Sequence, residues 1–290
     1  MTNDFFLVLQ INKIKRRNKK LFVVYLYGMD INLQNKRALV CGSTQGIGLA
    51  TARELASLGA SVTLLARNEM ALKEISASLP SPNNQKHDYI IADFNNPDQL
   101  RISLNNYLQG GNIFNILVNN TGGPSGGPIT EAKADDFENT FRQHLVCNHI
   151  LAQAVLPGMR DSGYGRIINI ISTSVKQPLK GLGVSNTIRA AVANWSKTLA
   201  TEVAPWGITV NNVLPGATLT QRLSSLIEAK SIKTGKEVKI LEKEMIHEIP
   251  AGRFADPSEI AAAVGFLASP SAAYITGINV PVDGGRTGCL

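Results

Sequence analysis

The sequence predicts a single α/β domain, built as a doubly wound parallel sheet with helices on both faces. Three observations support this fold class. From residue 37 onward, apolar runs with β-strand character alternate with longer segments of helical periodicity. The apolar runs are nearly continuous, as expected of strands that are buried on both faces. No Pro/Ser-rich linker and no internal repeat divides this part of the chain.

Seven segments are predicted as strands because their apolar character is nearly unbroken. In chain order they cover residues 37–41, 61–66, 89–92, 116–118, 167–171, 209–214 and 278–282. Six segments between them have helical periodicity and cover residues 47–58, 69–79, 97–108, 133–159, 185–203 and 257–267. Strand-helix alternation of this kind implies a parallel sheet that is covered on both sides.

A glycine-rich loop follows the first predicted strand and opens the first helix. Its residues are Gly42, Ser43, Thr44, Gln45, Gly46, Ile47 and Gly48. Glycine allows a tight turn and lets backbone N–H groups approach a pyrophosphate, and the dipole of the helix N-terminus favours the same anion. At the head of a parallel series, this loop predicts a Rossmann-type dinucleotide site. The alternative is a tight turn that needs glycine for packing alone.

The residues that follow the second predicted strand indicate which dinucleotide is bound. An acidic residue at this point would bind the ribose 2′-hydroxyl of NAD, but the sequence here is Ala66-Arg67-Asn68. The guanidinium of Arg67 can instead pair with the 2′-phosphate of NADP. We therefore expect NADP as the cofactor, with NADPH preferred over NADH. A solvated surface arginine is the alternative.

Further motifs follow in order along the chain: Asn119-Asn120-Thr121-Gly122, Pro215-Gly216 with Thr220 downstream, Tyr274-Ile275-Thr276-Gly277 and Asp283-Gly284-Gly285. Together with the glycine-rich loop, they resemble the short-chain dehydrogenase/reductase family over residues 31–286, and its 3-oxoacyl-[acyl-carrier-protein] reductase-like members in particular. The resemblance implies that Asp93 contacts the adenine. It also implies that Asn119, Thr121 and Gly122 line the cofactor, and that Pro215, Gly216 and Thr220 contact its nicotinamide end.

The resemblance also implies a catalytic group. In that family a Tyr donates the proton to the carbonyl oxygen, and a Lys lowers the tyrosine pKa and holds the nicotinamide ribose. A Ser binds the substrate oxygen, and an Asn supports a proton relay. Counting along this chain places Ser172 at the serine position, Ser185 at the tyrosine, Arg189 at the lysine and His144 at the asparagine. Three of these four residues therefore differ from the family pattern.

The three substitutions change the available acid-base chemistry. Ser185 and Arg189 are four residues apart and share one helix face, but a serine hydroxyl is a far weaker acid than a phenol. Arg189 can hold a ribose hydroxyl or an anionic substrate, yet it cannot serve as a proton reservoir. His144 is the best remaining proton donor, either directly or through a water that it orients. The alternative is a histidine that is bonded to backbone or water behind the site.

Two segments are expected to border the substrate. Residues 122–128 hold four glycines and two prolines directly after a strand, where ligands bind in parallel sheets; a simple surface turn is the alternative. Residues 218–247 form a helical insertion that resembles the family's mobile substrate lid. An oligomer contact or a plain covering helix pair are the alternatives for this second segment.

The positive charge of the chain is concentrated near its N-terminus. Residues 1–28 carry +5 of the formal net charge of +7, so residues 29–290 carry only +2. A nucleic-acid-binding face is therefore not expected. We expect residues 1–28 to be an N-terminal extension, either disordered or an artefact of the gene start, and residues 29–290 to form the domain. An interfacial membrane anchor is the alternative for the extension.

The remaining composition argues for a cytoplasmic protein without a metal or a membrane segment. Cys41, Cys147 and Cys289 match neither a disulfide framework nor a zinc spacing, which is typical of a reducing cytoplasm. No apolar run reaches the roughly 18 residues that a membrane-spanning helix needs. The isolated histidines suggest no metal site.

Two functions stay open at this point. The first is an NAD(P)(H)-dependent oxidoreductase that acts on a small-molecule carbonyl or alcohol with an altered catalytic group. The second is a catalytically inactive NADP-binding sensor or partner subunit. The resemblance also implies a homo-oligomer, for example a tetramer, that pairs through helices such as 133–159 and 185–203. The sequence does not identify the substrate.

Overall fold

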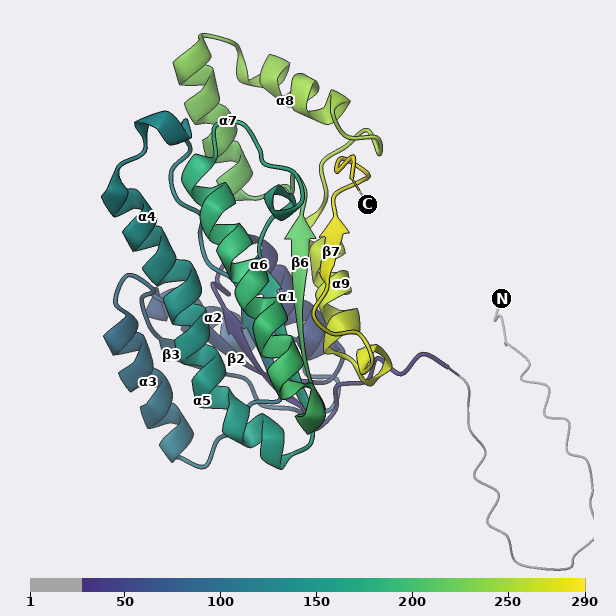
Figure 1. The fold of residues 1–290 in the computed structure, drawn as a ribbon. Coiled ribbons are helices and arrows are strands. Elements are labelled where there is room, and N and C mark those ends of the chain that lie inside the picture. The colour runs from purple at the N-terminus through teal and green to yellow at the C-terminus, as the bar shows by residue number, and fades with distance from the viewer. Residues whose placement is uncertain (1–27, 290) are drawn as a thin grey trace, which may run out of the picture.

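A seven-stranded parallel sheet forms the centre of the protein in a computed structural model that describes residues 28–289 (Figure 1). The spatial order of the strands is β3-β2-β1-β4-β5-β6-β7, so the chain reverses its direction of travel across the sheet between β3 and β4. Ligands bind at such switch points, outside the carboxyl ends of the strands. The strands are β1 (Arg37–Cys41), β2 (Ser61–Ala66), β3 (Asp88–Ile91), β4 (Ile116–Asn119), β5 (Gly165–Ile170), β6 (Ile208–Pro215) and β7 (Asn279–Val282).

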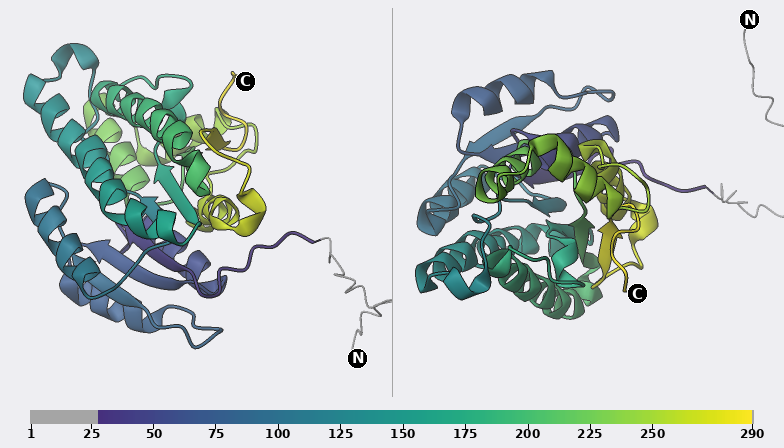
Figure 2. Two further views of the ribbon diagram at one scale, coloured as in Figure 1. Left: turned by 60° about the horizontal axis from the view of Figure 1, so that its bottom comes forward. Right: turned by 90° about the horizontal axis from the view of Figure 1, so that it is seen from above.

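Helices cover both faces of the sheet (Figure 2). One face is covered by α1 (Gly46–Ser57), α2 (Glu69–Ser78) and α9 (Pro257–Ala268). The other face is covered by α3 (Pro97–Gln109), α5 (Cys147–Asp161) and α6 (Gly183–Val203). The predicted fold class, a doubly wound parallel sheet with helices on both faces, is therefore confirmed.

The two helical layers explain why the strand sequences are apolar without alternation. In β1, Ala38 and Val40 pack into the core on one face, and Leu39 and Cys41 pack into the core on the other. All four side chains are fully buried. Successive side chains of a strand point to opposite faces, so a strand with a helical layer on each side needs apolar residues at every position.

Polar caps fix where several helices begin. The side chain of Asn68 accepts a hydrogen bond from the backbone N–H of Ala71 at the start of α2. Asp256 and Glu259 form a reciprocal capping box at the start of α9. These side chains satisfy backbone donors that the first helical turn leaves without partners. The predicted starts of α2 and α9 agree with the structure for this reason.

The prediction of one continuous helix over residues 133–159 is wrong. The structure has α4 (Ala134–Phe141), a π-helical segment (Arg142–Val146) and α5 (Cys147–Asp161) in direct succession. A π-helical segment accommodates one extra residue per turn, and such segments are frequent at functional sites. His144 lies in the middle of this one, and its side chain is buried. The other elements begin and end within two residues of their predicted bounds, which is the usual spread of such assignments.

Residues 218–247 form two helices beyond the carboxyl ends of β6 and β7 (Figure 1). These are α7 (Gln221–Thr234) and α8 (Val238–His247), so the helical character of the insertion is confirmed. They pack on a small separate cluster that contains Leu223, Ile227 and Leu241. Because this cluster is distinct from the two main cores, the helix pair rests on the domain through few buried residues. Whether the pair acts as a lid stays a prediction.

Two absences hold within residues 28–289, the part of the chain that the structure describes. None of the helices formed by these residues combines the length and apolar character needed to span a membrane. Within the same residues there is no group of three or more His, Cys, Asp or Glu side chains placed to hold a metal ion. The prediction for the N-terminal extension covers residues 1–28, of which residues 1–27 lie outside the described part of the chain.

Candidate active site

The loop of residues 42–48, here called the phosphate loop, joins β1 to α1 and depends on its glycines. Gly42 and Gly46 have φ angles of +57° and +53°, a region that L side chains rarely adopt. At Gly48 the reason is contact, since an added Cβ would lie 2.1 Å from the carbonyl oxygen of Gly42. Gln45, the N-cap of α1, provides no side-chain cap. The loop therefore brings a bare backbone and the start of a helix together, which fits a pyrophosphate.

Asn120 supports the phosphate loop from the neighbouring strand, and the sequence analysis did not single it out. Its side-chain amide donates hydrogen bonds to the carbonyl oxygens of Cys41 and Gly42, each at 3.2 Å. In the sequence, the position of Asn120 in the Asn119-Asn120 pair was the feature that could have identified it as a site residue. Ser43, which was predicted as a cofactor residue, is fully buried. Its hydroxyl donates to the carbonyl oxygen of Leu65 of β2 at 3.4 Å, so the side chain is directed into the protein.

The carboxyl end of β6 meets the phosphate loop. A Cβ added to Gly46 would lie 3.1 Å from the side-chain methyl of Thr220, so the two residues are in contact. Thr220 is also the N-cap of α7, where its hydroxyl accepts a hydrogen bond from Leu223. Gly216 packs on Asp283, with its hypothetical Cβ 2.7 Å from the Asp283 Cα. Of the predicted residues at and after the end of β6, the structure therefore places Thr220 in contact with the phosphate loop, and Gly216 against the segment that follows β7.

Arg67 and Asp93 form a separate pair after β2 and β3. The closest approach of the guanidinium and the carboxylate is 4.0 Å, and their side chains are 70% and 41% exposed. A surface ion pair of this kind contributes no more than about 1 kcal/mol. Arg67 is therefore free to exchange Asp93 for another anion at little cost.

Asn119 belongs to a row of four asparagines on adjacent strands. Asn119, Asn169, Asn212 and Asn279 are in register across β4, β5, β6 and β7. The amides of the first three members each donate to the side-chain oxygen of the next member, at 2.8–3.0 Å. The side chain of Asn119 is thus committed to the sheet, although its Oδ1 has no partner within residues 28–289. The next two predicted residues, Thr121 and Gly122, are more accessible.

The four predicted catalytic residues come from three elements that pack together. Helix α6 carries Ser185 and Arg189, and it packs on the π-helical segment with His144 and on the short turn that follows Ser172. The Ser172 hydroxyl accepts a hydrogen bond from the N–H of Ser174 at 3.1 Å. Arg189 donates to the carbonyl oxygen of Ile170, at the end of β5, at 2.9 Å. The group therefore surrounds the carboxyl end of β5.

The imidazole of His144 is neutral near pH 7. Burial lowers its pKa to about 3, and the positive charge of Arg189 acts in the same direction, while a hydrogen bond with the Gly122 backbone opposes both. Its Nε2 atom is buried and has no hydrogen-bond partner within residues 28–289. A histidine in this state can orient a water molecule or a substrate oxygen, but it holds no extra proton at neutral pH.

A second arginine, Arg222 of α7, lies beside Arg189, and the sequence analysis missed it. A Cβ added to Gly123 would lie 3.3 Å from Nη2 of Arg222 and 3.6 Å from Nη2 of Arg189. Burial and the charge of Arg222 lower the pKa of Arg189 to about 10. Arg222 also donates to the carbonyl oxygen of Pro124, a residue 98 positions earlier in the chain. No local pattern signals a contact over such a separation.

Residues 122–128, here called the glycine-proline loop, lie between the start of α6 and helix α7. The N–H of Gly127 donates to the carbonyl oxygen of Gly181 at 2.7 Å, and the N–H of Gly183 donates back to Gly127. On its other side, the hypothetical Cβ of Gly126 would lie 3.7 Å from Leu226 of α7. These contacts hold the loop between the two helices, and its predicted place at the border of the substrate stays a prediction.

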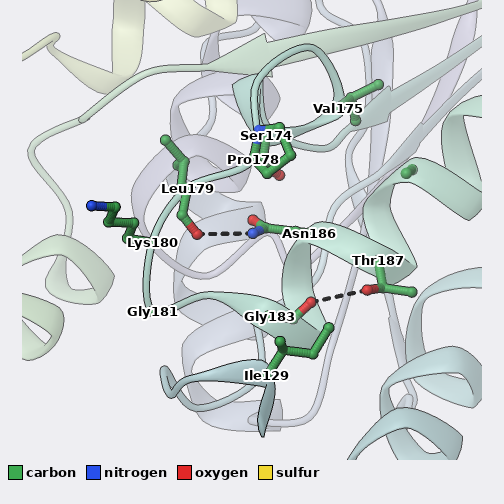
Figure 3. A pocket seen from close by; sticks show the side chains of 11 residues that line it. Ile129, Ser174, Val175, Pro178, Leu179, Lys180, Gly181, Gly183, Asn186 and Thr187 are labelled. Carbon is green, nitrogen blue, oxygen red and sulfur yellow. Dashed lines mark hydrogen bonds between the residues drawn. The ribbon is translucent and has the colours of Figure 1, made fainter.

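An open hollow of about 500 Å³ lies on a neighbouring face of α6 (Figure 3). Its wall is held by two hydrogen bonds, from the Asn186 amide to Leu179 and from the Thr187 hydroxyl to Gly183. None of the four predicted catalytic residues lines it, although Asn186, Thr187 and Ala190 of its lining belong to the same helix as Ser185 and Arg189. A smaller hollow of about 260 Å³, between α7 and α8, includes Thr220 and Gln221.

The chain matches a family model described as enoyl-(acyl carrier protein) reductase over residues 42–287. It is 36% identical over 257 residues to the 3-oxoacyl-[acyl-carrier-protein] reductase FabG of Vibrio cholerae serotype O1, covering 88% of this chain and 98% of that protein.

Two solved structures are similar over the same range. The L-sorbose reductase from Gluconobacter frateurii, complexed with NADPH and L-sorbose, has a TM-score of 0.83 and 33% identity, covering 90% of this chain and 100% of that one. A short chain dehydrogenase/reductase family protein has a TM-score of 0.74 and 30% identity, covering 88% of this chain and 99% of that one. The chain therefore belongs to the short-chain dehydrogenase/reductase family and is an NAD(P)-dependent oxidoreductase of that type.

Proposed function

We propose that this chain is an NADPH-dependent oxidoreductase that interconverts a carbonyl and an alcohol on a small-molecule substrate. The observation that carries the proposal is the phosphate loop, where a Cβ on Gly48 would collide with the Gly42 carbonyl oxygen. A turn that only has to pack tightly also needs glycine. Here, however, the N-terminus of α1 has no side-chain cap and lies against Thr220. This is the edge of the sheet, at the carboxyl ends of its strands, where ligands bind. The similarity to an L-sorbose reductase that binds NADPH supports the same assignment.

The residues for the cofactor form three groups in this proposal. Gly42, Ser43, Thr44, Gln45, Gly46, Ile47 and Gly48 hold the pyrophosphate through backbone N–H groups. Asp93 contacts the adenine, while Asn119, Thr121, Gly122, Pro215, Gly216 and Thr220 line the path toward the nicotinamide. Arg67 binds the 2′-phosphate, which is the reason to expect NADPH in preference to NADH. When bound, NADPH supplies the hydride.

The four residues at the end of β5 act on the substrate carbonyl. The hydroxyls of Ser172 and Ser185 donate hydrogen bonds to its oxygen, and the charge of Arg189 stabilises the negative charge that develops there. Arg189 also has free donors for a ribose hydroxyl or for the substrate. Because His144 is neutral at pH 7, it acts by orienting the water molecule that delivers the proton.

Fluorescence titration with NADPH and NADH tests the cofactor part of the proposal. We expect NADPH to bind at least about tenfold more tightly, because Arg67 can add a charge-assisted pair to the 2′-phosphate. The Arg67→Gln variant should lose this preference and keep its NADH affinity. Equal affinity of the unmodified protein for both dinucleotides would disprove the preference, and binding of neither would disprove the proposed function.

A panel of aldehydes, ketones and oxo acids, followed by NADPH oxidation, tests the catalytic part. The Ser172→Ala variant should lower kcat/KM by roughly 10²-fold, since removing one donor to a developing oxyanion has this order of effect. Its NADPH affinity should stay unchanged. Ser78→Ala, on the exposed end of α2, serves as the matched control. Tight NADPH binding with no turnover on any carbonyl would instead favour an inactive sensor or partner subunit.

We further propose a homo-oligomer, a tetramer in the simplest case, that pairs through α5 and α6. Sedimentation analysis of the purified protein tests this, with a monomer at micromolar concentration as the contrary result. The cytoplasmic location also stays a prediction. Cys41 and Cys147 are free and buried, and Cys289 is free and exposed, as would suit a reducing compartment.

A further inference from the structure

Two guanidinium groups from distant parts of the chain meet beside the glycine-proline loop. Arg189 reaches this point from α6, and Arg222 reaches it from α7. Their Nη2 atoms lie 3.6 Å and 3.3 Å from the position that a Gly123 Cβ would occupy. Glycine at this position therefore leaves room for both side chains, and the two positive charges are close neighbours.

Neither arginine has an acidic partner in the part of the chain that the structure describes. The ion pairs among residues 28–289 are formed by Arg67, Lys236, Arg253 and Arg286, each with its own carboxylate. Arg189 is half-buried, and within residues 28–289 the one hydrogen bond of its guanidinium goes to a backbone carbonyl oxygen. Burying a guanidinium without a counter-charge is unfavourable, and a like charge beside it adds repulsion. Both costs disappear when an anion binds between the two groups.

The imidazole of His144, which lies near the pair, supplies no negative charge. His144 is buried, and the charge of Arg189 helps to keep its imidazole neutral; its Nε2 has no hydrogen-bond partner within residues 28–289. Arg189 donates to Ile170, two residues before Ser172, so the pair borders the proposed reaction centre. Arg222 lies at the exposed rim and belongs to the predicted lid.

We propose that Arg189 and Arg222 bind a carboxylate of the substrate, so that the substrate is an oxo acid or the corresponding hydroxy acid. This inference rests on the proposed function and names its substrate class. Guanidinium groups match the two oxygens of a carboxylate with paired, charge-assisted hydrogen bonds. The cofactor pyrophosphate is the other possible source of anionic oxygens. Its proposed cradle is the phosphate loop, however, whereas Arg222 is directed to Pro124 of the glycine-proline loop.

Calorimetric titration with a matched pair of unreactive probes tests the proposal. Oxamate carries one carboxylate, whereas oxamide has the same size and no charge. We expect oxamate to bind the NADP⁺-loaded protein about 10- to 100-fold more tightly than oxamide, which is the usual worth of hydrogen bonds to a charged group. Arg222→Gln should remove most of this difference, and Arg222→Lys should keep part of it.

The controls separate the two sources of anion and the two proposals. Arg101→Gln, at an exposed position of α3 outside all the ion pairs above, should bind oxamate as the unmodified protein does. NADPH affinity should be unchanged in Arg222→Gln. If this variant instead weakens NADPH tenfold and leaves oxamate binding intact, the anion is the cofactor's and the inference is wrong. Equal binding of oxamate and oxamide also overturns it.

Failure of the proposed function and failure of this inference give different experimental results. If the unmodified protein binds no NADPH, the proposed function is wrong, while oxamate titration of the cofactor-free protein still reports on the two arginines. Circular dichroism of each variant shows whether it is folded. Arg222 is exposed, so its replacement should leave the spectrum unchanged.

Discussion

At the scale of single residues, the candidate site depends on side chains that are absent as much as on those that are present. A Cβ on Gly48 would lie 2.1 Å from the Gly42 carbonyl oxygen, and one on Gly123 would lie 3.3 Å and 3.6 Å from two guanidinium groups. Asn120 then holds the phosphate loop in place with two hydrogen bonds. The residues that shape the site therefore include several that would not contact a ligand.

Replacing Gly48 with Ala should abolish NADPH binding and destabilise the fold. The added methyl would lie 2.1 Å from a backbone oxygen, which no side-chain movement can relieve. Overpacking of this kind costs about 1–3 kcal/mol or more. Urea unfolding gives the loss of stability, and fluorescence titration gives the loss of binding. Gly28→Ala is the control, because nothing lies within 4 Å of that position. Unaltered NADPH binding by Gly48→Ala would show that the loop is not the cofactor site.

Protonation of His144 should destabilise the folded state in acid. Its pKa is about 3 in the folded protein and 6.5 for an ordinary histidine, so between these values the unfolded chain binds more protons. The free energy of unfolding should therefore fall as the pH is lowered from 6.5 toward 3. The slope reaches up to about 1.4 kcal/mol per pH unit from this residue.

Urea unfolding at several pH values measures the slope. His144→Gln should flatten it, whereas His149→Gln, at an exposed position of α5, should not. An identical pH dependence in the His144→Gln variant would mean that the imidazole is not held in its neutral form by the fold.

At the scale of elements, the asparagine row joins the four strands that end at the proposed active site. Asn169 is central, since its amide donates to Ser196 of α6 and to Asn212, and its oxygen accepts from Asn119. The row thus connects strands β4, β5 and β6 to the helix that carries Ser185 and Arg189. A polar network inside the sheet fixes the register of these elements as well as their stability.

Asn169→Ala should destabilise the protein by at least about 2 kcal/mol, because it leaves the buried amide of Asn119 without an acceptor among residues 28–289. Ser196 and Asn212 each lose one hydrogen bond as well, although they stay bonded to each other. Thermal and urea unfolding measure the effect. Asn194→Ala, at an exposed position of the same helix α6, should change stability by less than about 0.5 kcal/mol. Comparable stability losses in the two variants would contradict the role assigned to the row.

At the scale of the whole molecule, residues 28–289 contain a complete sheet, two main cores and both halves of the proposed site. The segment before β1 is attached by backbone contacts. The backbone N–H of Asp30 donates a hydrogen bond to the Ser271 hydroxyl at 2.7 Å. The backbone N–H of Leu33 donates to the carbonyl oxygen of Leu58, and Leu33 is fully buried. The residues of this segment that make these contacts all follow Met29 in the sequence.

A chain that begins at Met29 should therefore keep its melting temperature and its NADPH affinity. Scanning calorimetry and fluorescence titration of the two chain lengths measure this. The basic residues that would be removed carry most of the net charge, so binding to anionic vesicles should be compared as well. Loss of NADPH binding in the shorter chain would show that residues 1–28 contribute to the site.

The sequence alone determined the fold class, the positions of the seven strands and the phosphate loop. Each of these depends on neighbours in the chain: strand periodicity is local, and the glycines at 42, 46 and 48 act on their own turn. Counting along the chain also placed Ser185 and Arg189 on one helix, because helical spacing is regular.

The tertiary structure alone decided which charges meet and which side chains are free. The π-helical segment that buries His144 depends on packing against α6, and the low pKa of that histidine depends on its burial there. Arg222 reaches the glycine-proline loop across 98 residues of sequence. Contacts of this range are set by the packing of whole elements, and no local periodicity records them.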